Sequence, residues 1–286
     1  VKIMQDKITS YSFDSGIDGA SVLILGAIHG NEKCGSRAME KLIALFENGT
    51  FKLQKGKVTF VPISNPAAYK AHQRYIDVNL NRIMHIHDAP SQYEEHLANQ
   101  LVPLISAHDF TLDLHSIHSS GASFAFLDYP NDVAKDICEI LGVKTIFTGW
   151  TEMYEDSGDI TTLDCAHIAG KASVTVECGQ HEDPDSIRVA EECILNMLYY
   201  FGLLDGQVSQ TPDCLTVHAK YRVVKSAEGT LRPLEHMSTV KSGEVIAEFE
   251  NGESYTAPED GVVLIPFKDA QVGDEWLYLG QIVKAA

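Results

Sequence analysis

Short apolar runs alternate with helical patterns along roughly the first 200 residues of the chain. The run Ser-Val-Leu-Ile-Leu at residues 21–25 is typical of a strand that is covered on both faces. In residues 33–46, apolar side chains recur at the spacing of an amphipathic helix. Further strands are predicted at residues 57–63, 111–116, 123–128, 144–147 and 172–179, and further helices at 94–107, 132–141 and 184–201. This alternation predicts an α/β fold with a central mixed sheet sandwiched between helices.

The pattern changes after Leu204-Asp205-Gly206. From there, short β-rich runs are separated by Gly, Pro and Asp, and no helical periodicity is evident. Residues 242–249 and 257–266 are the clearest of these predicted strands. We therefore expect two domains, a larger one at residues 1–205 and a small all-β domain at residues 206–286.

Composition limits the classes of partner. The chain of 286 residues carries 22 Lys and Arg against 40 Asp and Glu, a formal net charge of −18. Because phosphate binding needs a basic surface, this balance argues against nucleic acid and anionic membranes as partners. The six cysteines are scattered without a Cys-x-x-Cys pair, which is typical of reduced thiols. Reduced thiols indicate a cytoplasmic protein, and no apolar segment approaches the ~20 residues of a membrane span.

A histidine and a glutamate follow the first predicted strand at a spacing of three residues. His29 and Glu32 lie in Gly-Ala-Ile-His-Gly-Asn-Glu, on the expected strand-to-helix loop at the carboxyl edge of the sheet, where open α/β sheets bind ligands. His115 ends a second buried strand and is expected at the same edge. Two histidines and one glutamate leave the fourth position of tetrahedral zinc open, as in catalytic sites. For His115 alone, capping of a loop is the alternative.

The segment Arg-Tyr-Ile-Asp-Val-Asn-Leu-Asn-Arg at residues 74–82 is rich in groups that bind carboxylates and carbonyl oxygens. Arg74 and Arg82 offer planar guanidinium groups, and Asn81 adds a further donor. Residues 69–82 show neither helical nor strand periodicity, which predicts a long ordered loop of the kind that often carries function. The alternative is a surface loop with two solvated arginines.

Glu177 lies near the end of the predicted strand at residues 172–179, where its carboxylate is expected to be buried. A buried carboxylate needs a partner or a chemical task. It is either a general base beside the metal site or one half of a structural salt bridge. Residues 151–164 form an acidic segment, for which a solvated lid is the simpler interpretation. If this segment lines the site, it suits a cationic group of the substrate.

Four motifs, in this order, resemble the succinylglutamate desuccinylase and aspartoacylase family of the zinc carboxypeptidase superfamily. They are His29-Gly30-Asn31-Glu32, Arg74-Tyr75-Ile76-Asp77 with Leu80-Asn81-Arg82-Ile83, Asp113-Leu114-His115-Ser116 and Glu177-Cys178-Gly179. The resemblance extends over about residues 20–180. It implies a zinc carboxypeptidase-like fold and a zinc-dependent hydrolase that cleaves the amide bond of a small N-acyl amino acid.

The resemblance also implies catalytic roles. By position, the metal ligands would be His29, Glu32 and His115, which would hold one Zn²⁺ per chain. Glu177 would act as general base and then as general acid. Arg74 would polarise the scissile carbonyl group and stabilise its oxyanion.

Substrate recognition follows from the same resemblance. Asn81 and Arg82 would hold the α-carboxylate of the substrate. The β domain would narrow access to the site, and its Tyr278 matches a substrate-contacting tyrosine of the family. Aspartoacylases carry an arginine for acidic substrates ten residues before the catalytic glutamate, and His167 stands at that position here. Together with the acidic segment at residues 151–164, this favours a neutral or basic amino-acid part, such as an acetylated diamino acid.

Two other functions are open to the same sequence. A zinc carboxypeptidase acting on short peptides shares the zinc ligands but needs a more open cleft, and the predicted β domain argues against it. A catalytically inactive binding module is disfavoured by the intact set of ligating and catalytic residues. We expect a small-molecule substrate and, because such assemblies are common, a homo-oligomer.

Overall fold

The computed structural model describes residues 7–208 and 214–283. Its helices are α1 (Cys34–Glu47), α2 (Pro66–Ala71), η1 (Leu80–Arg82), α3 (Tyr93–Ala107), α4 (Asp132–Ile140), α5 (Trp150–Met153), α6 (Thr162–Ile168) and α7 (Asp185–Tyr200). Its strands are β1 (Tyr11–Asp14), β2 (Ser21–Gly26), β3 (Lys57–Val61), β4 (Phe110–Ile117), β5 (Phe124–Phe126), β6 (Thr145–Thr148), β7 (Ala172–Gln180), β8 (Leu215–Val224), β9 (Gly229–Leu231), β10 (Thr239–Val240), β11 (Val245–Phe249), β12 (Ser254–Thr256), β13 (Gly261–Leu264) and β14 (Glu275–Val283).

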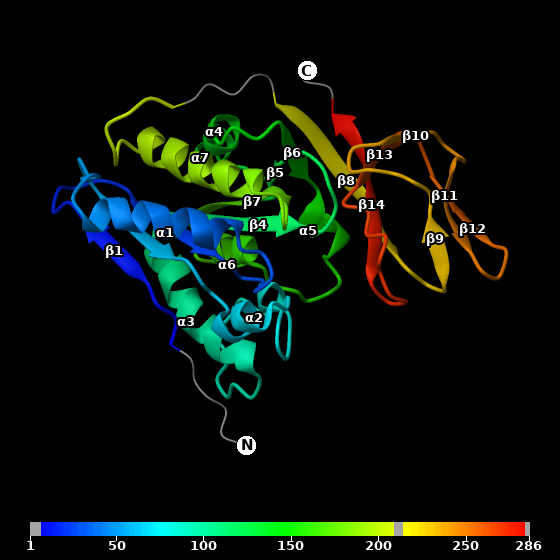
Figure 1. Cartoon of the computed structure of the whole chain (residues 1–286), viewed down its shortest axis with the longest axis horizontal. Helices are drawn as coiled ribbons and strands as arrows, with labels where there is room; N and C mark the ends of the chain where they lie inside the picture. The colour runs from blue at the N-terminus through cyan, green and yellow to red at the C-terminus, as the bar shows by residue number, and fades with distance from the viewer. Residues whose placement is uncertain (1–6, 209–213, 284–286) are drawn as a thin grey trace.

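One large mixed sheet runs through the molecule (Figure 1). It has eleven strands in the order β1-β3-β2-β4-β7-β5-β6-β8-β14-β13-β10. Neighbours among β3, β2, β4 and β7 are parallel, whereas β1 and β5 run antiparallel to β3 and β7. The strands β12, β11 and β9 form a second, three-stranded sheet. The sheet is therefore mixed, as predicted.

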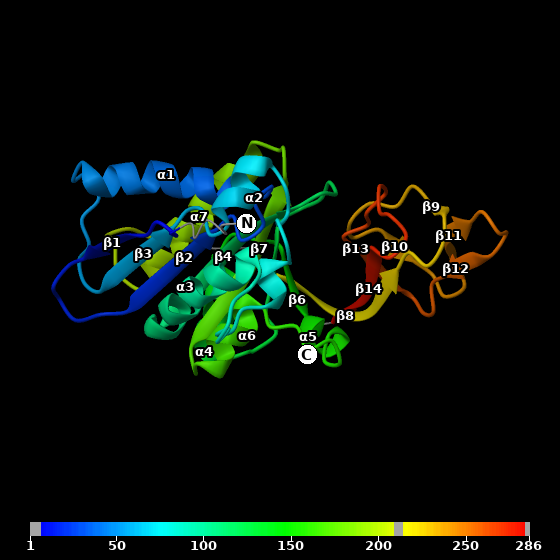
Figure 2. The same cartoon turned by 90° about the horizontal axis from the view of Figure 1, so that it is seen from below.

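Helices cover both faces of the parallel strands (Figure 2). Val22 and Ile24 of β2 pack in a cluster with side chains of α1 and α7. Leu23 and Leu25 point to the opposite face and pack with side chains of α3 and α6. All eight residues of β4 are buried. The continuous apolar runs in the sequence arise because neither face of these strands meets solvent.

The strands after residue 214 extend the large sheet on the side away from β1 (Figures 1 and 2). β8 pairs in parallel with β6 on one side and antiparallel with β14 on the other, so backbone hydrogen bonds connect the two parts of the chain. Residues 214–283 contain no helix, as expected, and they enclose apolar clusters of their own around Leu277 and Trp276. The division at residues 1–205 and 206–286 remains a prediction.

Two segments contain more regular structure than predicted. The expected loop at residues 69–82 includes the end of α2 and the short helix η1, and only residues 72–79 lie outside a helix. The acidic segment at residues 151–164 includes most of α5 and the start of α6. In the described part of the chain, none of the helices has the length and apolar character that crossing a bilayer requires.

Candidate active site

His29 and Glu32 lie on the loop between β2 and α1, where the sequence predicts them. Both side chains are buried, with exposures of 3% and 2%. The loop passes close beneath α2, because a Cβ atom on Gly30 would lie 2.1 Å from the backbone carbonyl carbon of Ala68. Only glycine fits this approach, so Gly30 allows the two flanking ligand candidates to face inward.

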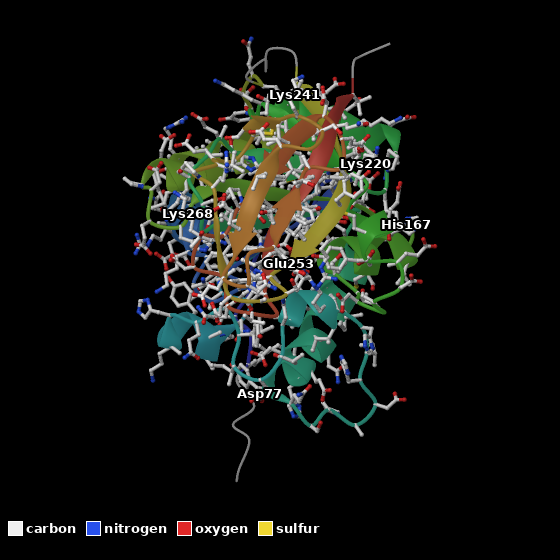
Figure 3. All side chains as sticks on the ribbon, turned by 90° about the vertical axis from the view of Figure 1, so that its right-hand side faces the viewer. Asp77, His167, Lys220, Lys241, Glu253 and Lys268 are labelled. Atoms are coloured by element: carbon white, nitrogen blue, oxygen red, sulfur yellow. The ribbon has the colours of Figure 1, made fainter. Side chains whose placement is uncertain are left out.

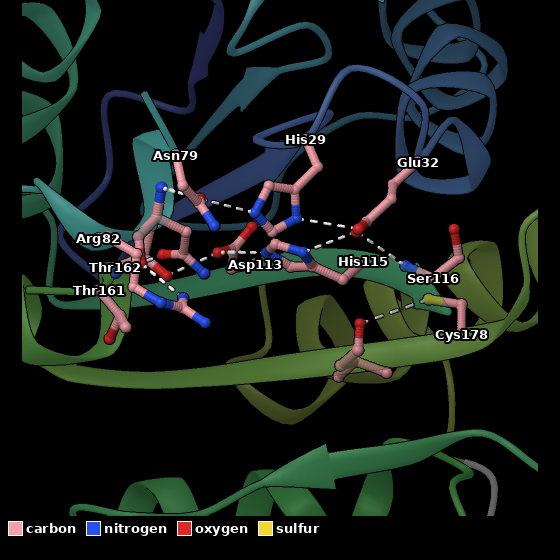
Figure 4. A network of polar contacts seen from close by, with 12 residues as sticks. His29, Glu32, Asn79, Arg82, Asp113, His115, Ser116, Thr161, Thr162 and Cys178 are labelled. Carbon is pink, nitrogen blue, oxygen red and sulfur yellow. Dashed lines mark hydrogen bonds and ion pairs between the residues drawn. The ribbon is translucent and has the colours of Figure 1, made fainter. Parts of the chain in front are cut away.

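The third candidate ligand, His115, lies on β4, which pairs with β2. Nδ1 of His29 lies 2.9 Å from Oε1 of Glu32, and Nδ1 of His115 lies 2.8 Å from Oε2 of the same carboxylate. One ligand atom from each of the three residues lies within 4.8 Å of the others. The three side chains therefore converge on one point from the ends of two neighbouring strands (Figure 4).

The outer nitrogen of each imidazole has its own acceptor. Nε2 of His29 lies 3.0 Å from Oδ1 of Asn79, and Nε2 of His115 lies 2.9 Å from Oδ2 of Asp113. Because both of these oxygen atoms are acceptors, Nε2 of each ring is the donor, and the two contacts direct both Nδ1 atoms toward Glu32. Anchored imidazoles of this kind are the usual setting of metal-bound histidines.

Burial and neighbouring charges shift the pKa values of all three groups. Burial, and then the charge of Arg74, lower the pKa of His29 to about 4, so its ring is neutral, the form that binds metals. Burial alone would lower the pKa of His115, but the charges of Asp113 and Glu32 raise it well above its usual range. Burial would raise the pKa of Glu32, but the two histidines hold it well below its usual value. Glu32 is therefore a carboxylate.

This donor set fits zinc. Two imidazole nitrogens and one carboxylate, with a fourth side left free, are a ligand set of catalytic zinc sites. All three residues are buried, and each imidazole is oriented by a second hydrogen bond. Among the described residues, this is the one group of three or more His, Cys, Asp or Glu side chains arranged to hold a metal ion.

Glu177 lies beside the metal ligands on β7. In the parallel pairing of β4 with β7, Glu177 is the register partner of His115. Its Oε2 atom is buried and has no hydrogen-bond partner among the described residues, and no ion pair to it is formed there. Burial, and then the charge of Glu32, raise the pKa of Glu177 to about 8. A carboxyl group with a pKa near neutrality can both accept and donate a proton at physiological pH.

Arg74 lies on the loop at residues 72–79. Its Nη1 atom donates to Oε1 of Glu32 over 2.8 Å, while 44% of the side chain remains exposed. The loop is held by Glu94 of α3, whose buried carboxylate accepts hydrogen bonds from the backbone N–H groups of Ile76, Asp77 and Val78. This explains how a segment without periodicity is ordered, and the sequence contained no sign of this role for Glu94.

Asn81 and Arg82 lie in η1, and both face the same cavity as the metal ligands. Oδ1 of Asn81 accepts the backbone N–H of Thr162 over 2.9 Å, so the amide NH₂ is the side of Asn81 that remains available to a ligand. The guanidinium of Arg82 lies 5.2 Å from the ring centroid of Tyr154, and its Nε is 3.4 Å from Oδ2 of Asp159.

The cavity has a volume of about 1080 Å³ and is strongly acidic. Its lining carries three arginines, Arg74, Arg82 and Arg222. It also carries nine acidic residues, Glu32, Asp128, Glu152, Glu155, Asp159, Asp164, Glu177, Asp274 and Glu275. Four of them belong to residues 151–164. The acidic segment therefore lines the cavity, which is the arrangement that suits a cationic group of the substrate.

Strands β8 and β14 contribute part of the wall. Tyr278 lines the cavity, and its hydroxyl lies 2.7 Å from the hydroxyl of Tyr154, which also donates to Glu275 over 2.6 Å. The guanidinium of Arg222 lies 4.7 Å from the centroid of the same Tyr154 ring, 3.2 Å from Glu275. Arg222 was missed from the sequence because its strand has no motif around it.

His167 does not line the cavity. It lies on the exposed side of α6 and stacks on Tyr129 with 3.9 Å between ring centroids (Figure 3). On a helix it is rotated by about 140° from the buried Thr162, so it faces away from the site. The structure does not support the predicted contact between His167 and a substrate. His167 does not line the cavity, whereas Tyr129, on which it stacks, does.

Comparison with known proteins identifies the family. The sequence model of one protein family, the succinylglutamate desuccinylase/aspartoacylase catalytic domain, matches residues 18–201. The N-alpha-acetyl-L-2,4-diaminobutyric acid deacetylase of Halomonas elongata is 27% identical over 208 residues, covering 68% of this chain and 58% of that protein. The succinylglutamate desuccinylase of Vibrio vulnificus is 29% identical over 118 residues, covering 38% of this chain and 34% of that protein. The chain thus matches less than two thirds of the length of either relative.

Solved structures show the same fold. A succinylglutamate desuccinylase/aspartoacylase from Rhodobacter sphaeroides superposes with a TM-score of 0.80 at 19% identity, covering 97% of this chain and 90% of that one. The ectoine utilization protein EutE (DoeB) from Ruegeria pomeroyi gives a TM-score of 0.77 at 21% identity, covering 92% of this chain and 86% of that one. Both confirm the predicted mixed α/β architecture with additional carboxy-terminal strands. Because the family model extends over more than half of the chain, this protein belongs to the succinylglutamate desuccinylase/aspartoacylase family.

Proposed function

We propose that this protein is a zinc-dependent hydrolase that cleaves the amide bond of a small N-acyl amino acid. One observation carries the proposal: His29, Glu32 and His115 converge beside Glu177 in a cavity that also contains Arg74 and Arg82. The family consists of deacylases, and the donor set fits one Zn²⁺ per chain.

Each residue then has a task in the reaction. Bound zinc would supply Lewis-acid activation of the attacking water and of the scissile carbonyl group. Glu177 takes a proton from the water at its free Oε2 atom and returns it to the leaving nitrogen. The exposed Arg74 exchanges its bond to Glu32 for one to the developing oxyanion.

Asn81 and Arg82 bind the carboxylate of the substrate in this proposal. The amide of Asn81 is oriented by Thr162, which leaves its two N–H donors to the cavity. The planar guanidinium of Arg82 supplies a paired contact with the carboxylate. Arg222 and Tyr278 add polar groups to the same wall.

For the amino-acid part, we propose a cationic side chain. Apart from Glu32, which would bind zinc, and Glu177, whose pKa is raised, seven carboxyl groups face three arginines, and this excess gives the cavity a negative potential that favours an ammonium group. Asp128 is the central candidate, because its carboxylate is held by the backbone N–H groups of Trp150 and Thr151 and no ion pair to it is formed within the described residues. The name of the Halomonas elongata relative, a deacetylase of an acetylated diamino acid, agrees with this substrate class.

The alternative is a zinc carboxypeptidase acting on short peptides. Ile265 and Phe267, on the loop between β13 and β14, and Tyr278 of β14 line the cavity and limit the space available to a longer substrate. We therefore propose that these strands, in the predicted domain of residues 206–286, restrict access to the site and favour small substrates.

A substrate panel tests the proposal. Zinc-loaded protein is incubated with a mixture of N-acyl amino acids and short peptides, with the Glu177→Gln variant as control, and consumed compounds are identified by mass spectrometry. We expect loss of acetylated basic amino acids with wild-type protein alone. Loss of carboxy-terminal residues from peptides, with all acyl amino acids intact, would instead identify a carboxypeptidase.

A further inference from the structure

Thr162 belongs to the network of polar contacts that includes His29, Glu32 and His115 (Figure 4). Its side chain is 1% exposed. Its hydroxyl donates to Oδ2 of Asp113 over 2.6 Å, and its backbone N–H donates to Oδ1 of Asn81 over 2.9 Å. One residue therefore contacts two side chains that come from different elements, β4 and η1.

The position of Thr162 is fixed by its own helix. It is the first residue of α6, and the preceding Thr161 caps this helix together with Asp164. At a helix start, the first N–H groups have no partner within the helix, so the N–H of Thr162 is free to bind Asn81. Ile160 makes backbone hydrogen bonds of 2.8 Å with Arg82 and with Met84, which fasten the segment before α6 to η1.

Asp113 depends on few donors. Its carboxylate is 1% exposed, and Oδ2 accepts both the hydroxyl of Thr162 and Nε2–H of His115. Its other oxygen, Oδ1, has no hydrogen-bond partner among the described residues. A buried carboxylate without sufficient donors is costly. If the hydroxyl of Thr162 were removed, the hydrogen bond from His115 would be the main restraint on the Asp113 carboxylate.

We infer that Thr162 is a positioning residue of the metal centre. Its hydroxyl holds the Asp113 carboxylate in the orientation that aims Nδ1 of His115 at the metal, and the bond to Asn81 holds Thr162 itself. This role rests on the proposed zinc site. Thr162 and Asp113 also connect Asn81, which would bind the carboxylate of the substrate, to the metal ligand His115 through a short chain of hydrogen bonds.

The test compares zinc affinity in two substitutions at this position. Thr162→Val has nearly the same shape but no hydroxyl, and Thr162→Ser keeps the hydroxyl. Affinity is measured without substrate, by competition with a chromophoric chelator. Because loss of an outer-shell partner weakens metal binding by about 10–100-fold, we expect a loss of roughly tenfold for Thr162→Val, and we expect Thr162→Ser to remain close to wild type.

A matched control separates positioning from the loss of any buried hydroxyl. Thr111 is fully buried on β4, the strand of Asp113 and His115, and its hydroxyl has no partner among the described residues. Thr111→Val should leave zinc affinity unchanged. Cobalt-substituted protein gives a second measurement: we expect the visible absorption spectrum of the Thr162→Val variant to shift and that of Thr162→Ser to match wild type.

The outcomes separate this inference from the proposed function. If wild-type protein binds zinc and Thr162→Val binds it equally tightly, with an unchanged cobalt spectrum, the positioning role is wrong and the proposed function stands. Equal losses in Thr162→Val and Thr111→Val also contradict the role. Wild-type protein that binds no zinc contradicts both proposals.

Discussion

Acid should weaken the protein through His236, which packs the segment after β13 against β5. Its side chain is 8% exposed and stacks on Phe124 of β5, with 4.9 Å between ring centroids. Nδ1 accepts the backbone N–H of Ile265 over 3.0 Å. Ile265 lines the cavity and has a left-handed φ of 47°, which is strained for a β-branched residue. Protonation of Nδ1 would remove the acceptor that holds this backbone.

The magnitude follows from the pKa of His236, which burial lowers from 6.5 to about 4. Because the folded pKa lies below that of the unfolded chain, the unfolded state takes up the proton first as the pH falls. The stability contributed by the neutral ring is therefore complete above about pH 6.5 and is lost between 6.5 and 4. At about 1.4 kcal/mol per pKa unit, the full loss is about 3 kcal/mol, of which about 2 kcal/mol falls between pH 7 and pH 5.

The assay is urea unfolding of wild type and His236→Phe at pH 8, 7, 6 and 5. Phenylalanine keeps the ring on Phe124 but neither protonates nor accepts from Ile265, so we expect the variant to be about 1–3 kcal/mol less stable at pH 7. Other histidines titrate alike in both proteins, so the difference between them isolates His236. From pH 7 to pH 5 that difference should change by about 2 kcal/mol in favour of the variant. A difference that stays constant with pH would refute the reasoning.

Three further predictions concern the site. Glu177→Gln should lower kcat by about 10²–10⁴-fold with unchanged zinc content, and near-normal hydrolysis would remove Glu177 from the mechanism. His115→Ala should lose zinc on dialysis, as measured by atomic absorption, and full occupancy would contradict its assignment as a ligand. Asp128→Asn should raise KM for an acetylated diamino acid roughly tenfold, which corresponds to about the energy of one charged hydrogen bond. KM for an acetylated neutral amino acid should stay the same. Equal effects on both substrates would argue against a contact between Asp128 and an ammonium group.

The parallel half of the fold could be predicted because its signals are local. The apolar run of β2 and the helical pattern of α1 place His29 and Glu32 on one loop, and the strand pattern of β4 places His115. The pairing of β4 with β7 then puts Glu177 beside His115. In a parallel sheet, all these strand ends lie at the same edge, so local patterns suffice to bring the residues together.

The rest depends on contacts between residues distant in sequence. Arg222 reaches the cavity only because β8 pairs with β14, which no local pattern indicates. His167 was misplaced because its helix, α6, was not predicted, and the helix turns that side chain outward. The cap formed by Thr161 and Asp164 was a usable signal for α6, but the acidic composition of the segment favoured a loop.

The position of β14 in the sheet has a consequence for how the protein is made. Although it is the last of the described strands in sequence order, β14 lies between β8 and β13, so it joins the interior of the sheet and not its edge. Its partner strands cannot close around the cavity until residues 275–283 have left the ribosome. During synthesis β8 therefore has an unpaired edge until β14 emerges, and an unpaired strand edge favours aggregation.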